Sequence, residues 1–267
     1  MIDPERNIQI MAILNLNQDS YFAPSRHNMQ VLESGADIID IGAISTRPGA
    51  DEVPEEEEWR RLEPVLKVLD PSLNVSVDTT RSSIVRRVAD LLGRRFIVND
   101  ISAGEDDPAM LETVAALGLG YVAMHKRGTP VTMQGLCDYA DVVSDVADYF
   151  HRFAAMAEAA GVTGWILDPG FGFAKTISQN YALLKGLDAF SAFGHPVLVG
   201  VSRKSFIYKP LGIGPEDALA ATQAVQMAAL ERGADILRVH DVEAARQTVC
   251  LYRRLSVLDV PDRVVDL

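Results

Sequence analysis

The sequence predicts an α/β fold in which parallel strands alternate with helices. One pattern recurs eight times along the chain: a short apolar run, a loop with Gly, Asp, Asn or Ser, and an amphipathic segment. The runs follow one another at intervals of roughly 25 to 45 residues, the length of a strand–helix unit. Eight such units in about 250 residues favour a (β/α)8 TIM barrel with its active site at the C-terminal ends of the strands. The predicted strands are Ile10–Leu16, Ile38–Ala43, Asn74–Asp78, Phe96–Ile101, Gly120–Met124, Trp165–Asp168, Val197–Val201 and Ile236–Val239.

An open, doubly wound sheet is the alternative arrangement of such units. It is disfavoured because no glycine-rich dinucleotide fingerprint follows the first predicted strand. No low-complexity stretch or long linker interrupts the chain. We therefore expect residues 1–267 to form a single domain, with the barrel core at about residues 10–255.

Pro54 and the acidic run Glu55–Glu58 predict the start of a helix, because proline and carboxylates are favoured in a first helical turn. An apolar stripe from Leu62 to Leu69 follows at helical spacing and predicts the face that packs on the barrel. Pro64 is expected to kink this helix, at a cost of about 3 kcal/mol if unrelieved. We expect the acidic run to be a solvated face.

A longer helix is predicted over Asp138–Ala160. Gly161 is expected to end it, because glycine readily adopts the left-handed conformation that follows a helix C-terminus. Helices of this kind would form the outer layer of the barrel.

Composition and charge limit the classes of function. The net charge of −12 argues against sequence-independent nucleic-acid binding, although a local cluster of cations can still bind a small anion. The two cysteines, Cys137 and Cys250, have neither a disulfide nor a metal-site spacing. No signal-peptide pattern and no apolar run of about 18 residues occurs, so we expect a soluble, cytoplasmic protein without a membrane partner.

Polar side chains gather where the predicted strands end and the following loops begin. In a barrel these positions share one rim, where barrel enzymes carry out their chemistry. Each predicted strand brings at least one polar or charged residue to this rim. In chain order the rim residues are Asn15, Asp19, Thr46, Arg47, Pro48, Asp78, Asn99, Asp100, Met124, His125, Arg127, Asp168, Phe173, Lys175, Ser202, Arg203, Lys204, Ser205, Arg238, His240 and Asp241.

Several of these residues also have a purely structural explanation. Asp78 could cap the helix that follows it, and Asn99–Asp100 could form an Asx turn. Asp168 precedes a proline and could start a turn. His240 could be a structural histidine, and Asp241 is more simply explained as the cap of the last helix. The convergence of the whole set on one rim is what predicts a site.

The carboxylates of Asp78 and Asp168 and the amide of Asn99 suit a flat heterocycle with several ring N–H groups and a carbonyl. A carboxylate can accept two parallel N–H bonds from a 2-aminopyrimidinone edge, and such charge-assisted bonds are strong. Met124 and Phe173 could supply apolar contact to the ring. These residues therefore predict one half of a substrate site.

A second, cationic group consists of Asn15, Arg47, Arg238 and His240. It is expected where the first, second and eighth strands meet, and it suits a phosphate or diphosphate together with Mg²⁺. Arg238 could also stack on the heterocycle. A heterocycle beside a diphosphate suggests transfer of a heterocyclic group with diphosphate as the leaving group.

The rim residues belong to eight ordered blocks, MAILNLNQDSYF, GADIIDIGAISTRPGA, SVDT, VNDIS, MHKRGTPVTMQ, ILDPGFGFAKT, PVLVGVSRKSF and ADILRVHDV. With these blocks the chain resembles the dihydropteroate synthase family over about residues 10 to 255. The family joins (7,8-dihydropterin-6-yl)methyl diphosphate to 4-aminobenzoate and releases diphosphate, in folate biosynthesis. The resemblance implies the same transferase activity here, by a dissociative mechanism assisted by Mg²⁺, in a homodimer.

The resemblance also implies a role for each matched residue. The positions that hold the pterin match Asp78, Asn99, Asp168 and Lys204, with Arg238 stacked on the ring. The positions that engage the diphosphate match Asn15, Thr46, Arg47, Arg238 and His240, and Asn15 is also the expected Mg²⁺ ligand. The positions around 4-aminobenzoate match Pro48, Phe173, Lys204 and Ser205. The expected catalytic residues are Arg47, Asp78, Lys204, Arg238 and His240.

The first loop departs from the family pattern. Asn17 and Gln18 stand where the family has Thr and Pro, and Ile44 replaces a frequent glutamate. The segment before the first strand is short, so a hairpin at the barrel floor is expected to be reduced.

Because the first loop is altered, a non-catalytic pterin-binding paralogue or partner subunit is the alternative function. A methyltetrahydrofolate-dependent methyltransferase domain is a third, disfavoured by the cationic rim and by the lack of a corrinoid domain.

Overall fold

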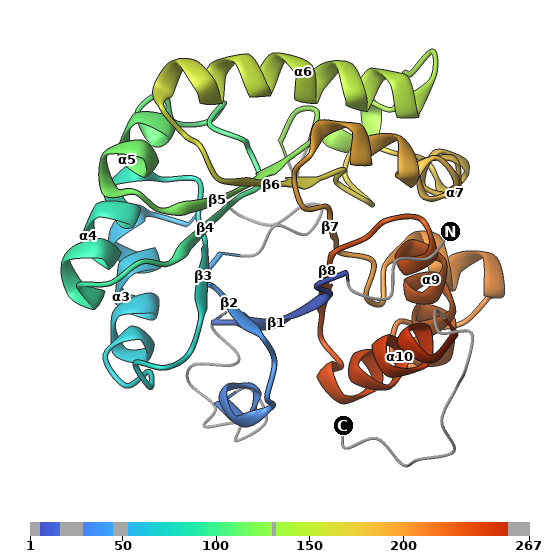
Figure 1. Ribbon diagram of the computed structural model, residues 1–267, viewed down its shortest axis with the longest axis horizontal. Helices are drawn as coiled ribbons and strands as arrows, with labels where there is room; N and C mark the ends of the chain where they lie inside the picture. Colours follow the sequence, from blue (N-terminus) through green and yellow to red (C-terminus); the bar gives the residue numbers. More distant parts are fainter. Residues whose placement is uncertain (1–5, 17–28, 45–52, 130–131, 256–267) are drawn as a thin grey trace.

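The computed structural model describes residues 6–16, 29–44, 53–129 and 132–255. Strands lie at the centre, and helices surround them in chain order from α3 through α6 to α10 (Figure 1). The strands are β1 (Gln9–Asn15), β2 (Ile38–Gly42), β3 (Val75–Asp78), β4 (Ile97–Asp100), β5 (Gly120–Met124), β6 (Trp165–Asp168), β7 (Leu198–Val199) and β8 (Ile236–Val239). The helices are η1 (Gln30–Glu33), α3 (Glu55–Leu66), α4 (Ser82–Leu92), α5 (Met110–Leu117), η2 (Met133–Gly135), α6 (Val142–Ala160), α7 (Ile177–Lys185), η3 (Leu187–Phe193), α8 (Ser205–Tyr208), η4 (Lys209–Leu211), α9 (Leu219–Glu231) and α10 (Val242–Leu255).

The strands pair in parallel in the order β6-β5-β4-β3-β2-β1-β8-β7. A parallel bridge between Leu167 and Val197 then connects the two ends of this order, and the Leu167 N–H donates to the Pro196 carbonyl at 2.9 Å. The predicted barrel is therefore confirmed, and the open sheet is excluded. The predicted apolar runs coincide with the observed strands, although β7 forms regular ladder pairs over Leu198–Val199 alone.

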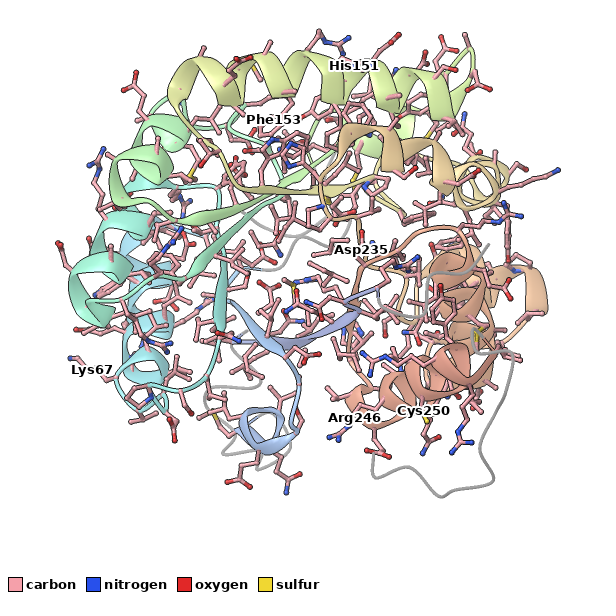
Figure 2. The ribbon with its side chains drawn as sticks, viewed as in Figure 1. Lys67, His151, Phe153, Asp235, Arg246 and Cys250 are labelled. Atoms are coloured by element: carbon pink, nitrogen blue, oxygen red, sulfur yellow. The ribbon has the colours of Figure 1, made fainter. Side chains whose placement is uncertain are left out.

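Alternation along the strands separates two apolar layers. Residues two apart on a strand share a face. One face contributes a small cluster inside the barrel, made of Met11, Ile38, Val122, Leu198 and Ile236. The other face packs outward against the helices in a larger cluster. On α6, Phe153 is buried on the side that faces the strands, whereas His151 lies on the outer, exposed side (Figure 2).

The sequence Gly-Ala-Asp-Ile occurs twice, at 35–38 and at 233–236, and both copies lead into a strand. The Asp37 carboxylate accepts from the Ile10 N–H at 2.7 Å, and the Asp235 carboxylate accepts from the Val197 N–H at 2.8 Å. Each aspartate thus fixes the start of its own strand against the neighbouring strand. These two bonds help to set the register at the amino-terminal end of the barrel.

Helix α3 begins one residue after Pro54, whose ψ of 147° is extended, so this proline precedes the first turn instead of lying in it. The helix continues past Pro64 to Leu66, and the predicted stripe from Leu62 to Leu69 is buried. The expectation of a solvated acidic run is wrong for Glu58, which is fully buried and pairs with Arg81. A partner on the loop that leads into the next helix makes that burial possible.

Helix α6 starts at Val142 and not at Asp138 as predicted. The reason is local, because Asp141 has an extended backbone and its carboxylate caps the Ser144 N–H at 2.8 Å. The predicted end is confirmed, since Gly161 follows the helix with a φ of 79°. Among the described residues, no helix is both long enough and apolar enough to cross a membrane.

Candidate functional site

The alternation of side chains fills the barrel interior with apolar residues. The same alternation places polar side chains in the next layer, nearer the C-terminal ends of the strands. Ile38, Ile97 and Ile236 belong to or pack on the interior cluster, and the residue two positions further along each strand shares that face. Those residues are Asp40, Asn99 and Arg238. The resulting polar layer on the inner face contains Asp40, Asp78, Asn99, Asp168 and Arg238, and the apolar Met124 lies at the same level on β5. Among the described residues, the polar layer is therefore built from five strands.

Arg238 links two carboxylates at the centre of this layer. Its Nε donates to Asp40 Oδ2 at 2.7 Å, and its Nη2 donates to Asp78 Oδ2 at 3.0 Å. Asn99 Nδ2 donates to the same Asp40 oxygen at 3.0 Å. The predicted residues Asp78, Asn99 and Arg238 are thus brought together by a fourth residue that the sequence reasoning missed.

Asp40 lies in the middle of β2 and is fully buried. A charged residue inside an otherwise apolar run is the signal that could have found it, since a buried carboxylate needs a partner. Its second oxygen, Oδ1, has no hydrogen-bond partner among the described residues and remains an acceptor for a further donor. Asp40 is therefore the anchor that holds Arg238 and Asn99 in position.

Asp168, Phe173 and Lys204 come together on the other side of the rim, as predicted. Lys204 Nζ donates to the Phe171 carbonyl and lies 4.8 Å from the centre of the Phe173 ring. Asp168 Oδ1 accepts from the Gly170 N–H at 2.8 Å, so this residue also forms the turn that its proline neighbour suggested. Ser205, the first residue of α8, is exposed next to Lys204.

Burial brings the pKa values of Asp78 and Lys204 closer to 7. Burial raises the pKa of Asp78 to about 7, against the opposing effect of the Arg238 charge. Burial lowers the pKa of Lys204 to about 8, although the nearby Asp168 carboxylate opposes the change. Burial also raises the pKa of Asp168. Groups with such pKa values exchange protons and donate or accept hydrogen bonds readily near pH 7.

The predicted anion-binding residues are described only in part. Asn15 ends β1, half-buried and paired in register with Gly42. His240 follows β8 and is exposed, with Nδ1 at 3.0 Å from Ser202 Oγ. Met124 ends β5, buried and in register with Asp168. Four predicted positions, together with the altered loop residues, lie outside the described residues: Thr46, Arg47, Pro48, Asp19, Asn17 and Gln18.

Two carboxylates of the predicted rim turn away from this site. Asp100 accepts from the Ser102 N–H at 2.7 Å and from the Tyr121 hydroxyl at 2.6 Å, which confirms the Asx turn. Asp241 directly precedes α10, and both of its carboxylate oxygens accept from Arg203, at 2.8 and 2.9 Å. Arg203 therefore pairs structurally, next to Lys204 in sequence but outside the polar layer.

Residues 11–240 match the protein family described as pterin binding enzymes. The dihydropteroate synthase of Escherichia coli (strain K12) is 41% identical over 247 residues, which cover 88% of this chain and 86% of that protein. The dihydropteroate synthase of Synechocystis sp. is 40% identical over 261 residues, covering 92% of this chain and 90% of that protein. The similarity therefore spans most of both proteins.

Solved structures show the same fold. The dihydropteroate synthase of Yersinia pestis, in a sulfonamide drug complex, aligns with a TM-score of 0.85 at 36% identity, over 94% of each chain. The enzyme of Thermus thermophilus, in complex with 4-aminobenzoate, aligns with a TM-score of 0.83 at 41% identity, over 95% of this chain and 96% of that chain.

Proposed function

The chain belongs to the dihydropteroate synthase family of pterin-binding enzymes, and from this membership we propose the reaction and the residues that perform it. The enzyme joins (7,8-dihydropterin-6-yl)methyl diphosphate to 4-aminobenzoate. The bond between the methylene carbon and the diphosphate oxygen breaks, and a bond from that carbon to the arylamine nitrogen forms. The nitrogen loses one proton, and the products are 7,8-dihydropteroate and diphosphate. This is a transferase reaction of folate biosynthesis.

The observation that supports this function most strongly is the polar layer centred on Arg238. Asp78, which accepts from Arg238, and Asn99, which donates to Asp40, offer a carboxylate and an amide on adjacent strands, the set that a pterin edge requires. Asp168 and Lys204 complete the pterin contacts from the opposite side of the rim. Met124 and Phe173 supply apolar contact, and Arg238 stacks on the ring.

The diphosphate binds beside the pterin, where β1, β2 and β8 meet. Asn15, Thr46, Arg47, Arg238 and His240 engage it. Among the described residues there is no cluster of three or more His, Cys, Asp or Glu that could hold a metal. A single amide ligand fits Mg²⁺ bound mainly through water and substrate phosphate, so Asn15 would hold it. Mg²⁺ would supply positive charge to the leaving diphosphate.

The mechanism is dissociative. Diphosphate leaves first, while the cations of Arg47, Arg238 and His240 stabilise its charge. Asp78, in its carboxylate form, stabilises the cationic pterin that remains. The arylamine, held by Pro48, Phe173, Lys204 and Ser205, then attacks the methylene carbon. Electrostatic stabilisation of the leaving group is the main catalytic effect.

Product analysis tests the function. Purified protein mixed with both substrates and Mg²⁺ should form 7,8-dihydropteroate, identified by mass, over many turnovers. A sulfonamide should compete with 4-aminobenzoate, because both are arylamines with an acidic oxygen-bearing group para to the amine. Failure to form product with micromolar enzyme would exclude the proposed activity.

The alternative, a non-catalytic pterin-binding paralogue or partner subunit, is suggested by Asn17 and Gln18 in the first loop. It requires pterin binding in calorimetry without turnover. Turnover at ordinary enzyme rates, which lie at about 1 to 1,000 per second, would exclude it.

The assembly and location of the enzyme are further parts of the proposal. We expect a homodimer, as the family resemblance implies, and a cytoplasmic enzyme. Light scattering of the purified chain tests the first, with twice the mass of 29.1 kDa as the expected result. Fractionation of cells tests the second, with the enzyme expected among the cytoplasmic proteins.

A further inference from the structure

A buried lysine, Lys175, lies beside the proposed substrate site and has no carboxylate partner among the described residues. It is 4% exposed, and its Nζ has three neighbours, His125 Nδ1 at 2.9 Å, the Gly170 carbonyl at 2.9 Å and the Phe173 carbonyl at 3.1 Å. An ammonium group has three N–H donors and no acceptor. Burial lowers the pKa of Lys175 to about 7. Below that pH its ammonium donates to three neutral acceptors, and His125 Nδ1 is one of them.

His125 is suited to this role. It is 2% exposed, and burial together with the Lys175 charge lowers its pKa to about 2. The ring is therefore neutral, and when Lys175 is an ammonium the lone pair lies on Nδ1 and the proton on Nε2. Its position is fixed by backbone as well, because the His125 N–H donates to the Asp168 carbonyl at 2.9 Å.

The loop that Lys175 holds has an unusual backbone. Between Asp168 and Lys175, three residues have positive φ: Gly170 at 71°, Gly172 at 82° and Ala174 at 48°. Such a backbone is costly for a residue with a side chain and persists only where surrounding contacts hold it. A side chain on Gly170 would place its Cβ 1.9 Å from the His125 carbonyl, so the β5 and β6 loops are in direct contact here.

This loop presents proposed substrate-binding residues. Its turn is closed by Asp168, and Phe173 lies at its far end with Lys204 Nζ over the ring. Asp168 is also the last residue of β6, where the strand fixes it independently. Phe173 lies outside the strand, and the bond from Lys175 to its carbonyl is a direct constraint on its position.

We propose that Lys175 and His125 form a clasp that positions Phe173 for 4-aminobenzoate. Lys175 is thus a positioning residue that does not touch the substrate itself. The inference rests on the proposed function, because Phe173 matters through its place beside 4-aminobenzoate. Loss of the clasp should affect 4-aminobenzoate far more than the pterin. Phe173 gives the pterin one apolar contact, whereas Asp78, Asn99 and Asp168 are held by their own strands.

The test compares four variants of the full-length enzyme. Lys175→Met removes the three donors at similar length, and His125→Leu removes the acceptor. His125→Asn restores an acceptor near the Nδ1 position, and Lys126→Met is the matched control. Lys126 follows His125 in the loop after β5 and is similarly buried, but it pairs with Asp106 at 2.7 Å, outside the clasp.

Lys175→Met and His125→Leu should raise the KM for 4-aminobenzoate about tenfold, while the pterin dissociation constant changes less than about threefold. His125→Asn and Lys126→Met should stay close to wild type. A wild-type KM in Lys175→Met or His125→Leu would overturn the clasp. So would an equal loss of pterin affinity, which indicates general loosening.

If circular dichroism shows that Lys175→Met does not fold, the comparison of His125→Leu with His125→Asn decides the question alone. If wild-type protein forms no product, the proposed function fails. The clasp is then judged by binding of 4-aminobenzoate to the pterin complex in calorimetry. The same split between the two ligands is expected there, and its absence would contradict the clasp.

Discussion

At the scale of single residues, Asp78 is the group whose protonation matters most. It is 8% exposed and bonded to Arg238, and burial raises its pKa to about 7. The carboxylate form is the one that accepts two N–H bonds. Between about pH 4 and 7 the folded protein holds this proton while the unfolded chain has lost it, so this group lowers stability as pH rises through that range.

Pterin binding should therefore strengthen as pH rises to about 7 and then level off. The dissociation constant is expected to be about tenfold weaker at pH 6 than at pH 8, because the carboxylate fraction changes by that factor. Asp78→Asn should weaken binding by roughly 1.5 to 3 kcal/mol at pH 8 and remove this pH dependence. Calorimetry at several pH values measures both, and an unchanged dissociation constant would contradict the role of Asp78.

Lys204 is expected to act in turnover and not in folding. It contacts the Phe171 carbonyl and the Phe173 ring through its ammonium group. Lys204→Ala should reduce kcat about 100-fold, the effect of losing one preorganised donor, with an unchanged circular dichroism spectrum. Lys209→Ala, at an exposed position five residues later, is the control. Unfolding of Lys204→Ala would instead indicate a structural role.

At the scale of elements, the contact between the β5 and β6 loops depends on Gly170. Its φ of 71° and the 1.9 Å that would separate an added Cβ from the His125 carbonyl oxygen leave no space for a side chain. Gly93, which ends α4 with a φ of 59°, has no described atom within 4 Å of such a Cβ.

Gly93→Ala should therefore cost about 1 to 2 kcal/mol of unfolding free energy, the penalty of the left-handed backbone alone. Gly170→Ala should cost more, because the two loops must also separate. Urea unfolding measures both values. Equal costs would show that the loop contact can relax.

The limits of sequence reasoning are also clearest in particular elements. The strands were predictable because a buried parallel strand needs an apolar run. The polar residues of the rim were predictable because a barrel brings the C-terminal ends of its strands together. Asp40 was missed because it lies within a strand. Its role depends on a hydrogen bond from Arg238, which is 198 residues away in the sequence. Glu58 was misjudged because its partner Arg81 lies beyond the next strand. The α6 start depends on one local cap at Asp141. For Asp40 and Glu58 the deciding partner is absent from the local pattern, whereas the α6 start depends on a cap between neighbouring residues.

At the scale of the whole molecule, a chain of net charge −12 presents cations at one rim of its barrel. Arg238 and Lys204 lie at this rim beside the carboxylates of Asp78 and Asp168, and such a local group of cations can bind a small anion despite the overall charge. The barrel makes this possible because the residues come from strands far apart in sequence. The fold therefore brings the proposed pterin-binding residues to the same end of the barrel as Asn15, Arg238 and His240, the described members of the proposed diphosphate group.

The most direct test of this account is diphosphate release in mixtures that each lack one component. We predict multiple-turnover release only when the pterin diphosphate, 4-aminobenzoate and Mg²⁺ are all present, with EDTA abolishing it. Multiple-turnover release without 4-aminobenzoate, or no release in the complete mixture at micromolar enzyme, would contradict the account.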